Sequence, residues 1–366
     1  MSVGAPAGGD RPLRFGFVVH PLGGFQRRLL GVRSADMPLM SGRPSTRPPG
    51  RLISRLQLEV AGRPTVEGVL AAIPALPEAL LTDQSRGVED VLDAVRLCNG
   101  FGASVVGLGA VTAVIGGQGK AIAEAAPCAV TSGNAMTAWA ASETWRRFAE
   151  LRRGPLRAGL FGLPGAVSGG ILRLLVRAGA EVFAALPAPP MPLLRLAQRL
   201  NAEGPGRVGF VPDWQTALAR GGVLLAASST GGRIPLGELP AGSVVIDVAE
   251  PVDVLPDVPP REDVLLLDGE MVHLPQPLRG SEPWQTLYGW VTGQHGRVFA
   301  CFAEPMLLAA TGRTELATCG RELPLERLLA LGELAGANGF QVDRLCEGGR
   351  PVRGARLKAF SDRGRG

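Results

Sequence analysis

The chain has 366 residues, a length that suggests two or three domains. It is 46% hydrophobic and 19% charged, which is enough apolar material for packed cores and excludes a chain that is disordered throughout. The 51 glycines show no three-residue period, which excludes collagen. Five distant cysteines without a Cys-x-x-Cys pair exclude a disulfide framework and a cysteine-based zinc site, and three scattered histidines suggest no metal site.

The first part of the chain predicts a loose tail followed by an α/β unit. Apolar residues at helical spacing indicate a helix from about Ser85, and Gly100 is a suitable residue to end it. A surface loop rich in Pro, Ser, Gly and Arg is expected at 37–55. In chain order, strands are predicted at 15–19, 56–61 and 103–107.

A second α/β unit is predicted from about residue 155. Its strands alternate with helices and glycine turns, which is typical of a doubly wound parallel sheet. Strands are predicted at 156–161, 181–186, 207–210, 222–227, 243–247 and 264–267, and helices at 171–178 and 193–200. The region 297–339 is expected to be richer in helix.

A glycine-rich turn follows the first strand of this second unit. Gly162, Gly165 and Ser168 have the spacing at which a strand–helix turn binds a dinucleotide, because glycine lets the backbone approach a pyrophosphate at the helix N-terminus. An ordinary tight turn without a cofactor is the alternative. Near Ala188, where such sites usually contact the ribose, the sequence has neither a carboxylate nor an arginine.

Residues 298–310 read Val-Phe-Ala-Cys-Phe-Ala-Glu-Pro-Met-Leu-Leu-Ala-Ala. With Gly312-Arg-Thr and 331–340, this segment resembles the long-chain acyl-[acyl-carrier-protein] reductases of cyanobacteria. Further similar pieces occur in the same order at 15–20, 107–112, 131–137, 162–168, 245–247 with Pro251, and Trp284, so the resemblance covers about residues 14–342. The chain departs from the family at Ser168, near Ala188, and at Ala135 and Met136.

The resemblance implies an α/β fold with an N-terminal substrate domain, a Rossmann-like doubly wound parallel sheet domain and a C-terminal helical segment. The expected division is a flexible tail at 1–13, the substrate domain at 14–145, the NAD(P)-binding domain at 146–295, the helical region with the catalytic cysteine at 296–345, and a flexible tail at 346–366. It further implies an oxidoreductase of fatty acid metabolism that reduces an acyl thioester to an aldehyde. The implied cofactor is NADPH, with NADH as the alternative, and the substrate is carried by acyl carrier protein or coenzyme A.

In that family a cysteine takes the acyl group, and the matching position here is Cys301. The local sequence also favours a reactive thiol: Pro305 is a suitable first residue of a helix, so Cys301 would lie just before a helix N-terminus, where positive potential favours the thiolate. The alternative is a small buried hydrophobic residue between Phe299 and Phe302.

Three other polar residues are candidates for the site. Glu304 is expected to act as a general acid or to cap a helix, and His20 to line the substrate site or to be structural. Asp247 ends a strand at the carboxyl edge of the second sheet, where ligands bind, so it is a candidate cofactor contact, with a turn-capping role as the alternative.

Two other functions remain open. One is a different NAD(P)-dependent dehydrogenase of a biosynthetic pathway, acting on a small carbonyl compound or hydroxy acid. The other is a non-catalytic protein that binds a carrier or a thioester.

Residues 1–60 hold nine arginines against three acidic residues, whereas the whole chain has a net charge of +5. Since acyl carrier proteins are acidic, we expect Arg43, Arg47, Arg51 and Arg55 to help dock such a carrier, with a solvated basic loop as the alternative. The resemblance adds an aldehyde-processing enzyme as a partner. No nucleic-acid motif is present, and neither a leader nor a membrane span is expected, which predicts a cytoplasmic protein.

Overall fold

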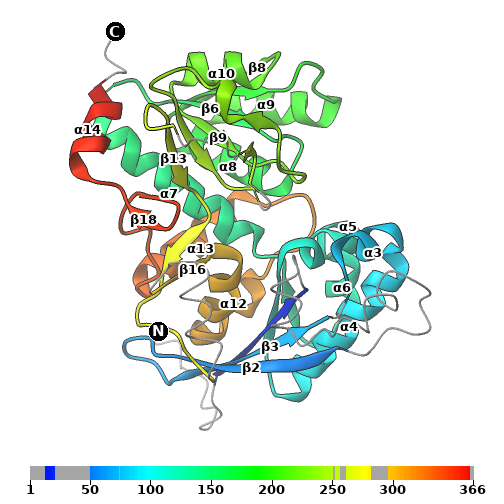
Figure 1. Cartoon of the computed structure of the whole chain (residues 1–366). Helices are drawn as coiled ribbons and strands as arrows, with labels where there is room; N and C mark the ends of the chain where they lie inside the picture. Colours follow the sequence, from blue (N-terminus) through cyan, green and yellow to red (C-terminus); the bar gives the residue numbers. More distant parts are fainter. Residues whose placement is uncertain are drawn as a thin grey trace, which may run out of the picture.

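The computed structural model describes residues 13–20, 50–73, 75–152, 154–249, 252–255, 261–281 and 296–362. It has two lobes, each built on a six-stranded sheet, with helices between them (Figure 1). The second sheet is parallel throughout, and the first is mixed. The predicted α/β fold class, with a Rossmann-like sheet and a C-terminal helical segment, is confirmed.

The first sheet has the strand order β15-β2-β3-β1-β4-β5. Strands β3, β1, β4 and β5 are parallel, β2 pairs antiparallel with β3, and β15 pairs antiparallel with β2 at the edge of the sheet. The strands are β1 (Leu13–Val19), β2 (Arg51–Leu58), β3 (Val66–Ala72), β4 (Val105–Leu108), β5 (Ala129–Thr131) and β15 (Arg279–Gly280). The helices of this lobe are α3 (Pro77–Thr82), α4 (Gln84–Gly100), the 3-10 turn η3 (Ala110–Ala113), α5 (Ile115–Gln118) and α6 (Lys120–Ala125).

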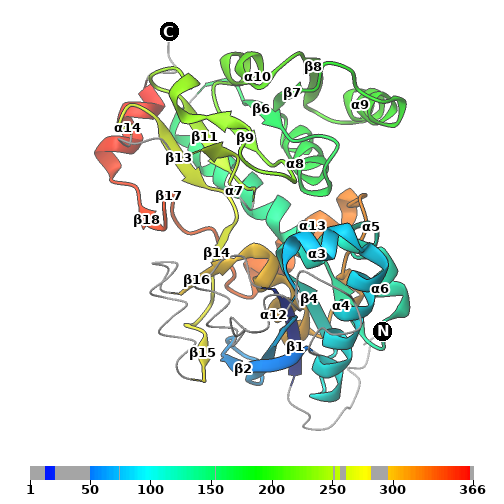
Figure 2. The same cartoon turned by 45° about the vertical axis from the view of Figure 1, so that its right-hand side comes forward.

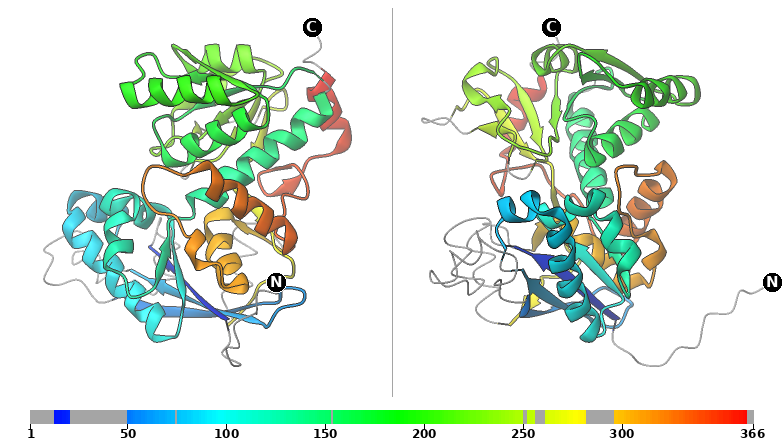
Figure 3. Two further views of the ribbon diagram at one scale, coloured as in Figure 1. Left: turned by 180° about the vertical axis from the view of Figure 1, so that it is seen from behind. Right: turned by 90° about the vertical axis from the view of Figure 1, so that its right-hand side faces the viewer.

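Both faces of the first sheet are covered, and β1 shows how. Successive side chains of a strand point to opposite faces. Phe15 and Phe17 contact the ring of Phe302, with centroids 6.3 and 4.6 Å apart, and so face helix α12 (Ala300–Thr311). Gly16 faces α4, where an added Cβ would lie 2.5 Å from the Cβ of Cys98. A segment far along the chain therefore covers the face of the sheet opposite α4 (Figure 3).

The second sheet has the order β13-β11-β9-β6-β7-β8. In order of appearance along the chain this is 6-5-4-1-2-3, the strand order of a dinucleotide-binding Rossmann fold. Its elements are β6 (Arg157–Phe161), α8 (Ala166–Arg177), β7 (Glu181–Ala185), α9 (Met191–Glu203), β8 (Arg207–Val211), α10 (Trp214–Gly221), β9 (Leu224–Ala226), β11 (Val244–Asp247) and β13 (Leu265–Asp268). Between β9 and β13 lie β10 (Ile234–Pro235), η4 (Leu236–Glu238) and β12 (Val254–Leu255).

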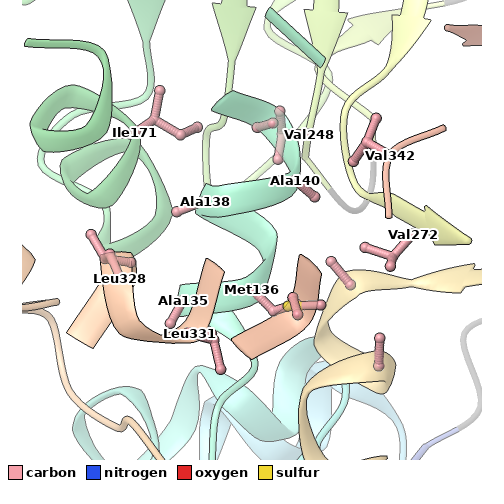
Figure 4. Packing of buried hydrophobic residues seen from close by; sticks show 14 of the residues in the cluster. Ala135, Met136, Ala138, Ala140, Ile171, Val248, Val272, Leu328, Leu331 and Val342 are labelled. Carbon is pink, nitrogen blue, oxygen red and sulfur yellow. The ribbon is translucent and has the colours of Figure 1, made fainter. Parts of the chain in front are cut away.

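Helix α7 (Asn134–Arg152) connects the two lobes and packs against α8, α12 and α13 (Leu325–Ala337). Two of its small residues lie beside these helices: Ala138 on the side of Ile171 of α8, and Ala135 near Leu331 of α13 (Figure 4). The lobes therefore share one apolar core.

After β13 the chain returns to the first lobe. The strands β14 (Met271–His273) and β16 (Arg297–Phe299) pair with each other, and β15 between them in sequence joins the edge of the first sheet (Figure 2). The 3-10 turn η5 (Thr314–Leu316) then separates α12 from α13.

The expected flexible tail from residue 346 is wrong for residues 346–362. These residues form β17 (Cys346–Glu347), β18 (Arg350–Pro351) and helix α14 (Gly354–Asp362). Arg356 donates to the Val264 carbonyl at 2.7 Å and pairs with Glu347 at 3.1 Å, while Asp268 accepts the backbone N–H groups of the β17–β18 turn at 2.9 Å. These polar contacts fasten the segment to the edge strand β13.

Candidate functional site

The glycine turn lies between β6 and α8, the first strand and first helix of the Rossmann sheet. Gly162 has a φ of +111°, and an added Cβ would lie 2.3 Å from the carbonyl oxygen of Ala227, so only glycine fits there. Gly165 is the N-cap of α8. The Ser168 hydroxyl accepts the Gly165 N–H at 3.1 Å and can donate to the Gly162 carbonyl at 3.0 Å. The Ser168 side chain therefore stabilises the turn by hydrogen bonds to both of its glycines.

Asp247 lies at the carboxyl end of β11, as the sequence suggested. Its carboxylate accepts the backbone N–H groups of Ala249, Asp253 and Val254 at 3.1, 3.2 and 2.9 Å. Burial raises the pKa of Asp247, and these three hydrogen bonds act against that rise. The Asp247 carboxylate therefore stabilises the turn that follows β11.

His20 follows β1 and is buried, with 5% of its surface exposed. Its Nε2 accepts the Val111 N–H at 3.0 Å, which ties the end of β1 to η3. Since β1 and β5 are both parallel to β4, His20 lies at the same edge of the sheet as the residues that follow β5.

Cys301 is the second residue of α12, and not a residue that precedes the helix. The expectation that Pro305 would begin this helix is wrong, because α12 begins at Ala300, whose N–H donates to the Glu270 carbonyl at 2.7 Å. Pro305 packs instead over Gly107 of β4, where an added Cβ would lie 2.7 Å from the proline ring. The half-buried Cys301 still lies in the first turn of α12, where the helix dipole gives positive potential.

The turn between β5 and α7 lies directly against Cys301. Gly133 in this turn has a φ of +73°, and an added Cβ would lie 2.4 Å from both Cα and Cβ of Cys301. No side chain fits between the two backbones. Thr131–Thr137 belongs to the sequence resemblance, but no role was predicted for Gly133, because a glycine between a strand and a helix is common.

Glu304 lies one turn after Cys301 and is completely buried. Its Oε1 accepts the hydroxyl of Thr131, and its Oε2 accepts the Met136 N–H at 2.8 Å. Met136 is the third residue of α7, so Glu304 caps α7 and not its own helix. Burial raises the pKa of Glu304 to about 7, against the lowering effect of its two hydrogen bonds.

The glycine turn and the turn beside Cys301 begin the helices α8 and α7, and these two helices contact each other near their N-terminal ends. An added Cβ on Gly170 of α8 would lie 2.8 Å from the Cβ of Ala138 of α7. Each of these residues is five positions after the turn that begins its helix, a distance of about 8 Å at 1.5 Å per residue. Sequence patterns did not reveal this contact, because it depends on a glycine meeting an alanine.

Over the described ranges, no group of three His, Cys, Asp or Glu side chains could hold a metal ion. Within the same part of the chain, no helix is both long and apolar enough to cross a membrane. Of the four arginines expected to dock a carrier, Arg43 and Arg47 lie outside the described residues, while Arg51 and Arg55 are exposed on β2.

Comparison with known proteins found similarity to an aminotransferase. The chain is 32% identical over 295 residues to "Aminotransferase PigE" of Serratia sp. (strain ATCC 39006). The match covers 79% of this chain and 34% of that protein, so the chain spans about a third of the relative's length. No protein-family model matches.

A solved structure, L-tryptophan dehydrogenase from Nostoc punctiforme, is also similar. It is 13% identical, with 68% of this chain and 66% of that chain covered and a TM-score of 0.33. At that score, the likeness carries no conclusion about fold or activity.

The similarity to an aminotransferase corrects the functional expectation. The reduction of an acyl thioester to an aldehyde is the wrong prediction for this chain, and the fatty-acid role and the enzyme class fall with it. NADPH, with NADH as its alternative, was expected as the reductant of the thioester, and this cofactor prediction is overturned together with that reaction, because an enzyme named for amino transfer points to pyridoxal phosphate. Neither acyl carrier protein nor acyl-coenzyme A gains support as a partner.

Proposed function

We propose that the chain is a dehydrogenase of a biosynthetic pathway, which interconverts a small hydroxy compound and the corresponding carbonyl compound. The single observation that carries the proposal is the strand order of the second sheet, with a glycine turn directly after its first strand. In such sheets a dinucleotide binds where the strand order reverses, which here lies between β6 and β9.

The residues of the turn fit a pyrophosphate-bearing dinucleotide. Gly162 cannot be replaced without a clash, Gly165 leaves the N-terminus of α8 without a side chain, and the turn is only partly buried. The first N–H groups of α8 would bind the pyrophosphate. When bound, the dinucleotide supplies or accepts the hydride.

Pyridoxal phosphate does not fit this chain. That cofactor is held through a Schiff base with a lysine, and the sequence has only two lysines. Lys120 has 69% of its side chain exposed and lies 3.8 Å from Glu124, and Lys358 is exposed on α14. Neither ammonium group is enclosed by a pocket. We therefore assign no amino-transfer step to this chain.

The similarity to an aminotransferase still supports a carbonyl compound as substrate. Amino transfer acts on carbonyl compounds, and a dehydrogenase makes or uses them, so the two reactions follow one another in biosynthesis. In this proposal the carbonyl compound binds beside Cys301, which is half-buried and lies against the backbone of Gly133. Cys301 and His20 are the proposed substrate-side residues.

Titration with ADP-ribose tests the proposal, because this molecule is common to the adenine dinucleotides. We compare Gly165→Asp with Gly165→Asn: both side chains cap a helix and have the same shape, but only aspartate repels a pyrophosphate. An added Cβ at Gly165 would lie 2.8 Å from the Ser168 hydroxyl oxygen and 3.0 Å from the Gly162 carbonyl oxygen, so both variants carry the same steric cost. We expect the wild type to bind ADP-ribose, and Gly165→Asp to bind it at least about tenfold more weakly than Gly165→Asn. Gly209→Ala, in β8 with open space around it, is the control for a glycine substitution in the same lobe.

Turnover is then measured by mass spectrometry, as the carbonyl product of small hydroxy compounds with an oxidised adenine dinucleotide. A wild-type chain that does not bind ADP-ribose would refute the proposal. So would equal affinities of Gly165→Asp and Gly165→Asn, because the ligand would then lie elsewhere.

A further inference from the structure

We propose that Glu304 is a positioning residue which clamps the β5–α7 turn against Cys301 and so controls the reactivity of the Cys301 thiol. The proposal takes Cys301 as a substrate-side residue from the proposed function. Its test measures the thiol itself and needs no substrate.

The clamp consists of two hydrogen bonds that reach the turn from both of its ends. Oε1 of Glu304 accepts the hydroxyl of Thr131, the last residue of β5, and Oε2 accepts the Met136 N–H at 2.8 Å in the first turn of α7. Gly133 lies between these two points and touches Cys301. The carboxyl group therefore fixes both flanks of the residue that covers the cysteine backbone.

Glu304 and the cysteine that it influences belong to the same helix, α12. Glu304 and Cys301 are three residues apart in α12, so their side chains lie on one face of the helix, about 5–6 Å apart at Cβ. A carboxylate at that distance disfavours a thiolate, and its charge strengthens both clamp bonds. Ionisation of Glu304 thus tightens the turn and restrains the thiol at the same time.

A third segment surrounds the carboxyl group. The Thr318 carbonyl accepts the Ser132 N–H at 2.8 Å, and the Cys319 thiol donates to the Val130 carbonyl at 3.4 Å. Cys319 is the titratable group whose charge interacts with Glu304, and burial raises its pKa to about 12, so it stays a thiol at neutral pH. Burial is the largest influence on the pKa of Glu304 and raises it, while the hydrogen bonds from Thr131 and Met136 lower it. The charged groups on the elements packed against α12 are Arg14, Glu67, His273, Arg297, Glu315 and the charged residues of α7.

The test is the alkylation rate of Cys301 by iodoacetamide, read by mass spectrometry of its peptide. Cys346 is the internal control, because it is buried in β17, away from the clamp, and reports global unfolding in the same digest. We compare the wild type with Glu304→Ala, Glu304→Gln and Thr131→Val.

In Glu304→Ala we expect Cys301 to react about tenfold faster or more, with Cys346 unchanged, because two hydrogen bonds to a charged group are lost. Glu304→Gln can still accept the Met136 N–H, so its turn stays in place. This variant has no carboxyl group to ionise, so we expect the alkylation rate of Cys301 to rise steadily with pH. In the wild type we expect the same rate to flatten near pH 7, where Glu304 ionises. Thr131→Val, which keeps the carboxyl group, is expected to react faster than the wild type.

Three results would overturn the clamp. They are a Glu304→Ala rate equal to the wild-type rate, a Thr131→Val rate equal to the wild-type rate, and the same pH profile in the wild type and Glu304→Gln. A joint rise of Cys301 and Cys346 in Glu304→Ala shows that this variant does not fold. If Glu304→Ala does not fold, Thr131→Val and the Glu304→Gln profile still decide the proposal. Loss of ADP-ribose binding would refute the proposed function without touching this result.

Discussion

Glu304 has a raised pKa, and this has a consequence for stability as well as for the site. Its ordinary pKa is 4.5, and burial raises it to about 7. A carboxyl group with a raised pKa binds its proton more tightly in the folded state, so the free energy of unfolding falls as pH rises from about 4.5 to about 7. The full loss corresponds to about 3 kcal/mol.

We therefore expect the melting temperature of the wild type to fall between about pH 5 and pH 8 by more than that of Glu304→Gln. The amide has no proton to lose, so the difference between the two curves isolates this group from Asp247 and Asp268, whose pKa values are also raised by burial. Thermal unfolding across this pH range is the measurement. Parallel curves would contradict the assignment.

The sequence predicted the chemistry of single residues better than their partners. The glycine turn at Gly162 and the position of Asp247 after a strand follow from short-range patterns. The role of Glu304 in capping α7 could not be predicted, because its partners Thr131 and Met136 are 173 and 168 residues away along the chain. Pro305 misled the prediction of the helix start, since a proline also fits inside a helix where its ring packs on a glycine.

At the scale of elements, the contact between α7 and α8 holds the two lobes together. Gly170 faces Ala138, and an added Cβ would lie 2.8 Å from the alanine Cβ. The neighbouring Gly169 meets only the flexible end of Arg173, at 3.3 Å. Substitution of each of the two glycines by alanine therefore compares a tightly packed position with an open one in the same helix.

Gly170→Ala is expected to destabilise the chain by about 1–3 kcal/mol, because overpacking forces the helices apart. Gly169→Ala should be neutral or stabilising by up to about 1 kcal/mol, because alanine favours helix. Denaturant unfolding of both variants measures the difference. Equal effects would show that the helices adjust to the added methyl group.

Helix α7 itself was missed by sequence patterns, whereas α4 was predicted almost to its ends. The reason is amphipathicity: α4 has one buried and one exposed face, so its apolar residues recur at helical spacing. Helix α7 packs against α8, α12, α13 and α14, so its buried residues are distributed around the helix and are mostly alanine and threonine. A helix that is buried on most sides has no regular alternation of apolar and polar residues by which the sequence could predict it.

At the scale of the whole molecule, the chain passes from the first lobe to the second and back, so the two lobes are packed together by segments that are distant in the sequence. Helix α12 follows the Rossmann sheet in sequence, yet it covers a face of the first sheet. The apolar core that includes Phe17, Ala138, Leu160 and Phe302 extends through both lobes. The alternating strand pattern indicated two sheets, but it could not show that the last third of the chain returns to the first of them.

We expect the two lobes to unfold in a single transition, since removing either one exposes the shared core. Far-ultraviolet circular dichroism and the fluorescence of tryptophan give two probes: Trp139 and Trp145 lie on α7, and Trp214 lies on α10. Coincident transitions from the two probes support one cooperative unit. Separated transitions would contradict it.

We propose that the glycine turn between β6 and α8 binds the dinucleotide of a dehydrogenase. Hydrogen exchange of the full chain with and without ADP-ribose tests it most directly, because the ligand would cover the backbone N–H groups of that turn. We expect slower exchange in the peptide that spans Gly162–Gly170, and unchanged exchange in α14. Unchanged exchange at the turn with saturating ADP-ribose, or protection confined to another region, would contradict it.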